Sequence, residues 1–321
     1  MSSIPLPNSA REKLAGATCL ITGGAGFIGS HLAHALVGLG ARVRVIDNLC
    51  GGFRANVPAA AEFVEASILD DAKLRAAAGG CQFVFHQAAM VSVPESVEAP
   101  DECMRVNVLG TERVLSAARS AQATRVMFAA SAAAYGNTPT LPSREDHLPD
   151  AYSPYAMSKI AGELLMQSFS RCYGLSTVSL RYFNIFGPRQ NPLSPYAAAI
   201  SKFTQVLRDG KRPTIFGDGE QTRDFTYIDN VVLANLLAAT APGPLMGEIV
   251  NIGTGARISL KLTLAHMGRI LKTDATPIPG PERAGDVRHS VADISRAREL
   301  LGYAPIVDFA SGLERTLLEP A

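Results

Sequence analysis

Residues 23–29 read Gly23-Gly24-Ala25-Gly26-Phe27-Ile28-Gly29, and this stretch decides the fold. It separates an apolar run, residues 17–22, from an amphipathic stretch, residues 27–39, so it predicts a turn between a β-strand and an α-helix. Gly23 permits the tight bend, Gly26 lets the backbone approach a pyrophosphate, and Gly29 lets helix and strand pack closely. The free N–H groups at the helix start would face the phosphates. We therefore predict a dinucleotide site at this turn.

The alternation of short apolar runs and amphipathic stretches continues to residue 181. This rhythm is typical of β-α-β units, whose right-handed crossovers place helices on both faces of a parallel sheet. The predicted fold class is α/β: a Rossmann-like doubly wound parallel sheet with a smaller α/β substrate-binding domain. Predicted strands cover 17–22, 43–46, 83–86, 125–130 and 176–181, and predicted helices cover 27–39, 71–78, 104–119 and 155–173.

After residue 181 prolines and glycines interrupt shorter elements, and the regular alternation fades. A second, smaller unit is expected to begin here. Residues 224–229 again read as a strand, and the apolar run that follows reads as a helix that could return to the first sheet. The predicted domains are a dinucleotide-binding domain over 17–183 with 224–250 returning to it, a mainly nucleotide-sugar-binding domain over 184–321, and an extension over 1–16.

Composition excludes several classes of partner. The 321 residues include 30 basic and 29 acidic side chains, so no overall field draws the protein to nucleic acid or to a membrane surface. The five cysteines are scattered without CxxC spacing, which disfavours disulfides and zinc and favours a cytoplasmic location. Residues 1–14 lack an apolar core, so we expect a loosely ordered segment, neither secretory signal nor membrane span.

Asp47 follows the apolar run 43–46, where an acid can accept hydrogen bonds from the ribose hydroxyls of adenosine. A carboxylate there repels a 2′-phosphate, so the sequence favours NAD over NADP. Capping of the turn before Asn48 is the alternative role for this carboxylate. The nearby arginines at positions 42, 44 and 54 supply positive charge that would instead favour the 2′-phosphate of NADP.

Tyr155 and Lys159 lie four residues apart, so both can face one ligand from a single helix. A nearby ammonium favours the phenolate, so we expect the pKa of Tyr155 to fall and the phenol to act as a general base. Ser131 follows the predicted strand 125–130, at the edge where doubly wound sheets present ligands. Its hydroxyl could bond the oxygen that loses its proton, or it could simply satisfy a local turn.

Taken in order, these motifs resemble the extended short-chain dehydrogenase/reductase family over the chain from about residue 18 to near its end. Within that family the chain looks most like the UDP-hexose 4-epimerases, and among those like the enzymes of the UDP-N-acetylglucosamine 4-epimerase type. The stretches that carry the resemblance are Gly23 to Gly29, Asp47-Asn48-Leu49, His86-Gln87-Ala88-Ala89, Ser131, Tyr155 with Lys159, Arg181-Tyr182-Phe183-Asn184, Ser194-Pro195-Tyr196-Ala197, Phe216 to Phe225 and Arg283 to Ser290.

The resemblance implies an isomerase that uses NAD to oxidise the sugar at C4, lets the keto sugar turn, and reduces it on the other face. It implies Ser131, Tyr155 and Lys159 as catalytic residues, with Tyr182 beside the nicotinamide. It also implies that arginines and Asn184 hold the diphosphate and that Asp286 binds the uridine ribose. The implied cofactor residues are Gly23, Gly26, Phe27, Ile28, Gly29, Asp47, Asn48, Ser67, Ile68, Gln87, Ala88, Ala89, Asn107, Tyr155, Lys159 and Tyr182; the implied substrate residues are Ser92, Ser131, Tyr155, Asn184, Tyr196, Phe216, Arg223, Arg283, Asp286 and Ser290; no metal is expected.

Three positions bear on specificity. Ser67 stands where the family commonly carries an aspartate that contacts adenine, so that contact would pass to a hydroxyl or to backbone. Residues 132–134 are all alanine where close relatives often carry Ser or Thr, which leaves more of the sugar contact to Ser131 and Tyr155. Ser290 stands where glucose-restricted epimerases carry a tyrosine, so the resemblance implies room for an N-acetyl group at C2.

Alternative functions remain open at this level. Relatives use the same opening oxidation for 4,6-dehydration, for decarboxylation of a uronic acid, or for epimerisation of uronic acids. Dehydration needs an acid pair beside Ser131, where this chain has Ala132 and Ala133. A non-catalytic NAD-binding sensor is another possibility, but it would not require Tyr155 or Lys159. By analogy with the family we expect a homodimer formed through the helices at 104–119 and 155–173.

Overall fold

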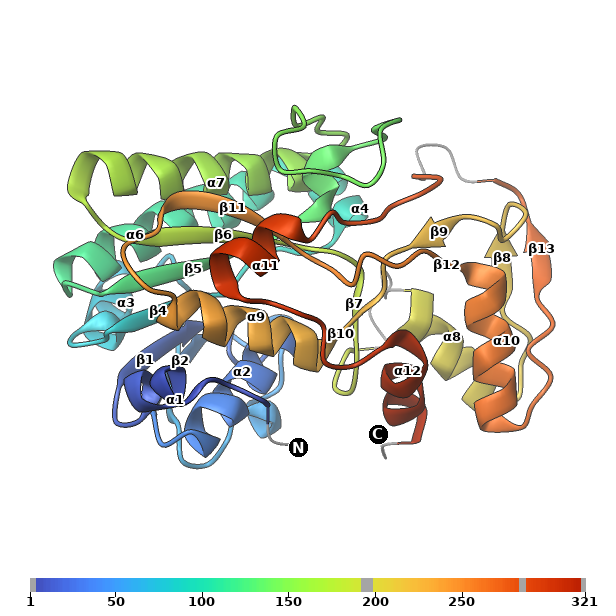
Figure 1. Ribbon diagram of the computed structural model, residues 1–321, viewed down its shortest axis with the longest axis horizontal. Helices are drawn as coiled ribbons and strands as arrows, with labels where there is room; N and C mark the ends of the chain where they lie inside the picture. Colours follow the sequence, from blue (N-terminus) through green and yellow to red (C-terminus); the bar gives the residue numbers. More distant parts are fainter. Residues whose placement is uncertain (1–3, 192–198, 283–286, 319–321) are drawn as a thin grey trace.

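The computed structural model describes residues 4–191, 199–282 and 287–318. Its centre is a parallel seven-stranded sheet in the order β11-β6-β5-β4-β1-β2-β3 (Figure 1). The strand order reverses between β1 and β4, so the loops that follow these two strands open a crevice at the carboxyl edge of the sheet. The strands are β1 (Thr18–Thr22), β2 (Arg42–Asp47), β3 (Glu62–Glu65), β4 (Phe83–His86), β5 (Arg125–Ser131), β6 (Thr177–Tyr182) and β11 (Met246–Ile252).

Helices cover both faces of this sheet, as Figure 1 shows. Every residue of β4 is buried, which explains why this strand begins with a continuous apolar run, Phe83-Val84-Phe85, rather than an alternating one. Every residue of β6 is buried as well, although its side chains alternate between polar and apolar. The predicted Rossmann-like α/β class is confirmed. One face carries α1 (Asn8–Leu14), α2 (Phe27–Gly38), α9 (Ile228–Thr240) and α11 (Ser295–Leu301), and the other carries α3 (Asp71–Ala78), α6 (Gly110–Ser120) and α7 (Pro154–Tyr173).

The longest helix, α7, has clear start and stop signals. The Ser153 hydroxyl caps it by accepting a hydrogen bond from the Ala156 N–H, and Pro154 occupies the first helical position. Gly174 ends it in the left-handed conformation at φ 68. The helix therefore presents Tyr155 and Lys159 in its first turns, close to the carboxyl edge of the sheet.

The chain leaves the sheet after β6, and the α8, α10, β8 and β13 group lies to the right of the sheet in Figure 1. It then returns, because β11 pairs in parallel with β6 while α9 packs against α2. We keep the division into 17–183 with 224–250, and 184–321, as a proposal. The remaining elements are η1 (Arg54–Asn56), α4 (Val93–Glu98), α5 (Pro100–Met104), η2 (Arg105–Leu109), η3 (Ala132–Tyr135), β7 (Ile185–Phe186), α8 (Ala199–Arg208), β8 (Thr214–Phe216), β9 (Thr222–Arg223), β10 (Thr226–Tyr227), β12 (Ile258–Ser259), α10 (Leu260–Leu271), β13 (Ile278–Gly280) and α12 (Phe309–Leu318).

The expectation of a loosely ordered N-terminal segment is wrong for the described residues. Residues 8–14 form α1, whose Leu14 is fully buried and whose Ala10 is 5% exposed in the main core. Lys13 Nζ donates to the Thr240 carbonyl at the end of α9. These few apolar side chains suffice because α1 packs against α9 rather than forming a core of its own.

Three further elements differ from the sequence-based prediction. The edge strand β3 was not predicted, because its residues Glu62 to Glu65 include two glutamates and only a partly buried middle. The strand expected at 224–229 shrinks to β10, since α9 already begins at Ile228. The helix expected at 104–119 is α5 and α6 joined by a π-helical turn, η2, over Arg105–Leu109.

Candidate active site

The glycine turn forms a cradle at the start of α2. Gly23 has φ +71, and a Cβ there would lie 2.7 Å from the Ala88 nitrogen. A Cβ on Gly29 would lie 2.2 Å from the Gly23 carbonyl oxygen, so strand and helix meet at backbone distance. No side chain in the described ranges caps the N–H groups at the start of α2. These groups are thus free to face an anion in the way helix N-termini bind phosphate.

Asp47 closes one side of the cradle. Its Oδ2 accepts from the Ala25 N–H at 2.9 Å and its Oδ1 from the Leu49 N–H at 2.8 Å. The carboxylate therefore serves the turn, as the alternative role supposed, yet each oxygen retains a lone pair for a ribose hydroxyl. Asn48 also acts locally, because its Oδ1 accepts from the Cys50 N–H.

The arginines near Asp47 are engaged elsewhere. Arg44 Nε pairs with Glu62 Oε2 at 2.8 Å, Arg42 Nε donates to Thr18 Oγ1, and the Arg54 guanidinium lies over the Phe63 ring. None of these contacts points to a 2′-phosphate, which supports NAD over NADP. Ser67 Oγ accepts from the Leu69 N–H, and Ile68 is 4% exposed against α6 at Gly110.

Ser131, Tyr155 and Lys159 come together at the carboxyl edge of β5. Lys159 Nζ donates to the Ala129 carbonyl at 2.8 Å and lies 5.7 Å from the centre of the Tyr155 ring. Ser131 Oγ accepts from the Ala133 N–H, and the Ser131 side chain is close enough to Tyr155 to oppose the rise in the pKa of that phenol. The serine thus supports a turn, as one of its two possible roles supposed, and it stands beside the tyrosine, where the other role would need it.

The expected fall in the pKa of Tyr155 is not found. Burial of the phenol raises the pKa of Tyr155, and the hydrogen bond with Ser131 only opposes this. Lys159 does not reverse the shift because its ammonium is bonded to a backbone carbonyl and is itself buried, at 3% exposure. Burial lowers the pKa of Lys159 to about 8, with Cys103 and Glu163 opposing. The protein alone therefore does not make Tyr155 a strong base.

Asn107 joins the catalytic helix to the loop after β4. It lies in the π-helical turn η2, where its Oδ1 accepts from the Met90 N–H at 2.7 Å and its Nδ2 donates to the Met90 carbonyl. Nδ2 also donates to Ser158 Oγ at 2.9 Å, between Tyr155 and Lys159 on α7. Ser158 and Ser96, whose Oγ accepts from the Tyr155 N–H, were not predicted from the sequence. Neither belongs to a pattern that distinguishes it from other serines.

His86 anchors a chain of hydrogen bonds beneath this site. Thr111 Oγ1 donates to the Asn107 carbonyl, so it must accept from His86 Nε2 at 2.9 Å. His86 Nδ1 then accepts from the Thr22 hydroxyl at 2.7 Å, which leaves Thr22 Oγ1 to accept from the Ala88 N–H. Each partner has one consistent role, so the neutral histidine fixes the π-turn and the start of the crevice loop together.

The crevice loop carries Gln87 beside Tyr182. Tyr182 is 8% exposed, and its hydroxyl exchanges hydrogen bonds with the Asn235 carboxamide on α9. Gln87 Nε2 donates to the Tyr182 hydroxyl at 3.3 Å, while the buried Gln87 Oε1 has no hydrogen-bond partner in the described part of the chain. Ala88 and Ala89 follow it, half-buried at the mouth of the crevice.

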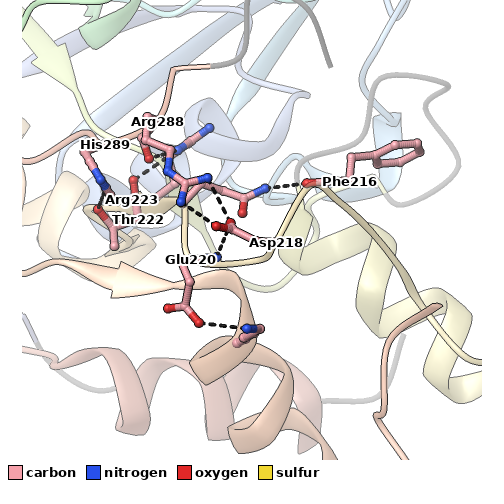
Figure 2. Close-up of polar contacts among 9 residues, drawn as sticks. Phe216, Asp218, Glu220, Thr222, Arg223, Arg288 and His289 are labelled. Atoms are coloured by element: carbon pink, nitrogen blue, oxygen red, sulfur yellow. Dashed lines mark hydrogen bonds and ion pairs between the residues drawn. The ribbon is translucent and has the colours of Figure 1, made fainter. Parts of the chain in front are cut away.

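Among the predicted substrate residues, Arg223 and Ser290 lie on neighbouring segments. The Thr222 N–H donates to the Arg288 carbonyl and the Ser290 N–H donates to the Thr222 carbonyl, so residues 288–290 run beside β9. Figure 2 shows Arg223 next to Arg288, whose guanidinium pairs with Asp218 through both nitrogens. Hydrogen bonding to Arg288 lowers the pKa of Asp218 to about 2. This patch brings several cations to one place in a nearly neutral protein.

Of the other predicted substrate residues, three have described positions and three do not. Ser92 caps α4 by accepting from the Glu95 N–H, and Asn184 is exposed with its carbonyl bonded to the Thr226 N–H. The Phe216 carbonyl accepts from Gln221 Nε2. Tyr196, Arg283 and Asp286 lie outside the described residues.

Among the residues with described positions, no three His, Cys, Asp or Glu side chains gather as metal ligands. Within the same ranges, no helix combines the length and apolar character needed to cross a membrane.

Fold and site together define a dinucleotide-binding enzyme of the Rossmann type in which Ser131, Tyr155 and Lys159 lie near one another at the carboxyl edge of the sheet. The chain belongs to the NAD dependent epimerase/dehydratase family, whose model matches residues 19–253. The resemblance to the extended short-chain dehydrogenase/reductases and the prediction of an NAD enzyme are thereby confirmed.

Individual relatives are similar to this chain over nearly its whole length. The UDP-glucose 4-epimerase of Mycolicibacterium smegmatis is 38% identical over 93% of this chain and 96% of its own. The UDP-N-acetyl-α-D-glucosaminuronate decarboxylase of Bacillus cytotoxicus is 32% identical over 93% and 96%. The structure of UDP-N-acetylglucosamine 4-epimerase from Methanobrevibacter ruminantium, in complex with UDP-N-acetylmuramic acid, superposes with a TM-score of 0.90 at 35% identity, covering 94% and 97%.

The residues present fit NAD. The uncapped start of α2 suits the pyrophosphate, Asp47 suits the adenosine ribose, and the unpartnered Gln87 Oε1 can accept from a carboxamide such as that of nicotinamide. An added Cβ on Gly26 would meet only the Gly23 carbonyl, at 3.3 Å, so one side of this backbone stays open to a ligand.

Two buried histidines predict sensitivity to acid. Burial lowers the pKa of His31 and of His86 to about 3, whereas an unfolded imidazole titrates near 6.5. Between these values the unfolded chain binds more protons, so the free energy of unfolding falls as the pH drops below about 6.5, by up to about 1.4 kcal/mol per pH unit per histidine. Urea unfolding at pH 6.5 and 5 should show the decline, and equal stabilities at the two values would contradict it.

Proposed function

We propose that the chain is an NAD-dependent C4 epimerase of UDP-hexoses that accepts N-acetylated sugars as well as UDP-Glc and UDP-Gal. The observation that carries the proposal is that Ser131 and Tyr155 stand together at the carboxyl edge of β5, the same edge of the parallel sheet at which the glycine cradle follows β1. A hydroxyl and a phenol placed there can share the oxygen of one secondary alcohol. The family match and the relatives named as 4-epimerases support the same reaction.

Tyr155 takes the proton from the sugar 4-hydroxyl and returns it when the sugar is reduced again. When bound, NAD supplies the acceptor for the hydride at sugar C4, and its positive charge favours the tyrosinate. Ser131 donates to the same sugar oxygen while the proton moves, and Ser96 holds the Tyr155 backbone through the Tyr155 N–H. Because the sugar is first oxidised and then reduced again, one turnover produces no net oxidation or reduction.

Lys159 supports this proton transfer from beneath the tyrosine ring. Its ammonium lies 5.0 Å from the Phe128 ring and donates to the Ala129 carbonyl, so it stays fixed while the ring is free to meet the sugar. A fixed positive charge costs no reorganisation when negative charge develops on the phenol. The pKa of Lys159, lowered to about 8, means that this support weakens as the pH rises through that value.

Inversion at C4 requires a firm hold on the nucleotide and a loose hold on the hexose. We assign the diphosphate to Arg223 and Arg283 with Asn184, because paired guanidinium donors match phosphate oxygens. We assign Asp286 and Phe216 to the uridine, and Ser92, Tyr196 and Ser290 to the sugar side. Only Ser131 and Tyr155 then bond the reacting oxygen, which leaves the keto sugar able to turn.

Acceptance of N-acetylated sugars depends on the small side chain at position 290. Ser290 is half-buried on the segment beside β9, and its N–H is bonded to the Thr222 carbonyl. Replacing Ser290 by tyrosine should fill the space for the acetyl group and abolish turnover of UDP-GlcNAc and UDP-GalNAc first. Turnover of UDP-Gal serves as the control. Equal losses on acetylated and plain sugars would show that position 290 does not select at C2.

Incubation of the NAD-loaded protein with UDP-Glc, UDP-Gal, UDP-GlcNAc and UDP-GalNAc tests the proposal, with anomeric proton NMR signals followed over time. We expect interconversion within each pair and no other product. Activity on the plain pair alone would overturn the N-acetyl assignment. A uronic acid epimerase, a decarboxylase or a dehydratase would leave all four sugars without their C4 epimers. A sensor would bind NAD and UDP-sugar and turn over none of them.

The dehydratase alternative is weakened by the structure around Ser131. Ala132 and Ala133 begin the 3-10 turn η3 directly after Ser131 and offer no acid for elimination at C5 and C6. A homodimer through α6 and α7 and a cytoplasmic location stay predictions. The exposed apolar residues Met157 and Leu164 on α7 suit such a contact.

A further inference from the structure

Asp224 directly follows Arg223, and its carboxylate is fully buried. Its Oδ1 accepts from the Thr254 N–H at 2.8 Å and from Thr254 Oγ1 at 2.7 Å. Its Oδ2 accepts from the Gly255 N–H at 2.9 Å and from the Ala292 N–H at 3.1 Å. An ionised carboxylate has about four acceptor sites, so these four bonds occupy it and leave nothing for a ligand. Whatever Asp224 does for the reaction, it does through its neighbours.

Those neighbours belong to different parts of the molecule. Thr254 and Gly255 follow β11, the edge strand of the main sheet, while Ala292 lies two residues beyond Ser290. The segment with Ser290 is already paired with β9, through the Thr222 carbonyl and N–H. Asp224 therefore links the sheet, the strand of Arg223 and the segment of Ser290 through one side chain, beside the backbone bonds that Ser143 makes to Val291 and Asp293.

We propose that Asp224 is a positioning residue that sets where Arg223 and Ser290 stand relative to the main sheet, and with it the affinity for the nucleotide sugar. This rests on the proposed function, which assigns Arg223 to the diphosphate and Ser290 to the sugar. The reacting groups Ser131 and Tyr155 belong to the sheet side of the junction, through β5 and α7. A shift at Asp224 thus moves the substrate-holding side chains and leaves the proton-handling ones in place.

The backbone and side chains around Asp224 are closely packed. A Cβ on Gly253 would lie 2.7 Å from Asp224 Oδ2 and 2.7 Å from the Ala292 Cβ. In an Asp224→Asn variant one acceptor becomes an N–H₂ group, which must face backbone N–H donors whichever way the carboxamide turns. Turned toward Thr254, it can donate to the Thr254 hydroxyl but leaves the Thr254 N–H unpaired and weakens the link to the sheet. Turned toward Gly255 and Ala292, it leaves both N–H groups unpaired and pushes the Ser290 segment away.

Calorimetric titration with UDP and steady-state kinetics with the UDP-sugar that the wild-type protein turns over test the proposal. We expect the Kd for UDP and the KM of Asp224→Asn to rise at least about tenfold, because losing one hydrogen bond between Arg223 and the charged diphosphate typically costs about ten- to a hundredfold in affinity. We expect kcat to fall less than KM rises, and NAD content to stay at the wild-type level. Asp293→Asn is the matched control, since Asp293 Oδ1 accepts from the Ser295 N–H at the start of α11 and the asparagine Oδ1 can accept the same hydrogen bond.

A second pair of variants keeps the test decisive if Asp224→Asn fails to fold. Thr254→Val removes one of the four hydrogen bonds, so it should raise Kd and KM in the same direction by less, whereas Thr254→Ser keeps the hydroxyl and should match the wild type. Values within about twofold of wild type for folded Asp224→Asn, or for Thr254→Val where it alone folds, would overturn the proposal. Wild-type protein that binds UDP but turns over no UDP-hexose would defeat the proposed function alone, and failure to bind UDP would defeat both.

Discussion

Tyr155→Phe lowers the turnover of every accepted UDP-hexose by about a hundred- to ten-thousand-fold, the usual contribution of a positioned proton-transfer group. The phenylalanine ring keeps its place beside Lys159 but can neither take nor return a proton. The Tyr155 N–H, bonded to Ser96 Oγ, is untouched by the change. NAD content and the melting temperature should therefore stay close to those of the wild-type protein. The loss should appear in kcat.

Tyr173→Phe is the control for this variant. Tyr173 ends the same helix, is 50% exposed, and stacks under the Arg119 guanidinium at 3.9 Å, a contact that phenylalanine preserves. We expect unchanged turnover. If Tyr155→Phe retained more than about a tenth of wild-type kcat, proton transfer would have to be assigned to another group.

Gly29→Ala abolishes NAD binding in the second experiment with a large expected effect. The added Cβ would lie 2.2 Å from the Gly23 carbonyl oxygen and 2.8 Å from the Gly24 Cα, and both are backbone atoms that cannot rotate away. The helix must move off the strand, which separates the start of α2 from the turn. Overpacking of this kind typically costs about 1–3 kcal/mol of stability, occasionally more. Cofactor retained after desalting and the midpoint of urea unfolding measure the two effects.

Gly38→Ala tests whether the effect is local to the cradle. Gly38 lies at the other end of α2, and a Cβ there meets no atom of the described chain within 4 Å. The same substitution should leave NAD content unchanged and raise the unfolding free energy by about 0.5–1 kcal/mol, because alanine loses less backbone entropy than glycine in a helix. Equal NAD content in Gly29→Ala and Gly38→Ala would contradict the assignment of the cradle.

Much of the fold follows from the sequence because its strongest signals are long and repeated. Strands such as β1 and β4 are buried and contain short unbroken apolar runs, and Pro154 and Gly174 mark the ends of α7. The residues of the edge strand β3 are exposed or only partly buried, so its sequence lacks the run of apolar residues that would predict a strand. α1 escaped prediction because its burial depends on α9, more than two hundred residues away, which no local pattern reports.

The site divides in the same way. Tyr155, Lys159 and the glycine turn are local motifs, so their positions could be predicted from spacing alone. Asp224, Ser96 and Asn235 act through partners that are distant in sequence, and nothing in their neighbourhoods distinguishes them. The direction of the pKa shift of Tyr155 was also out of reach, because it depends on burial and on the Lys159 bond to the Ala129 carbonyl.

The fate of the hydrogen at sugar C4 tests the central claim most directly. UDP-galactose carrying deuterium at C4 is incubated with the NAD-loaded protein in ordinary water, and the product is examined by NMR and mass spectrometry. The account predicts UDP-glucose with the deuterium still at C4 in the inverted configuration and no solvent hydrogen incorporated. Unchanged UDP-galactose, a product that has lost the label to solvent, or a 4-keto-6-deoxy sugar would contradict it.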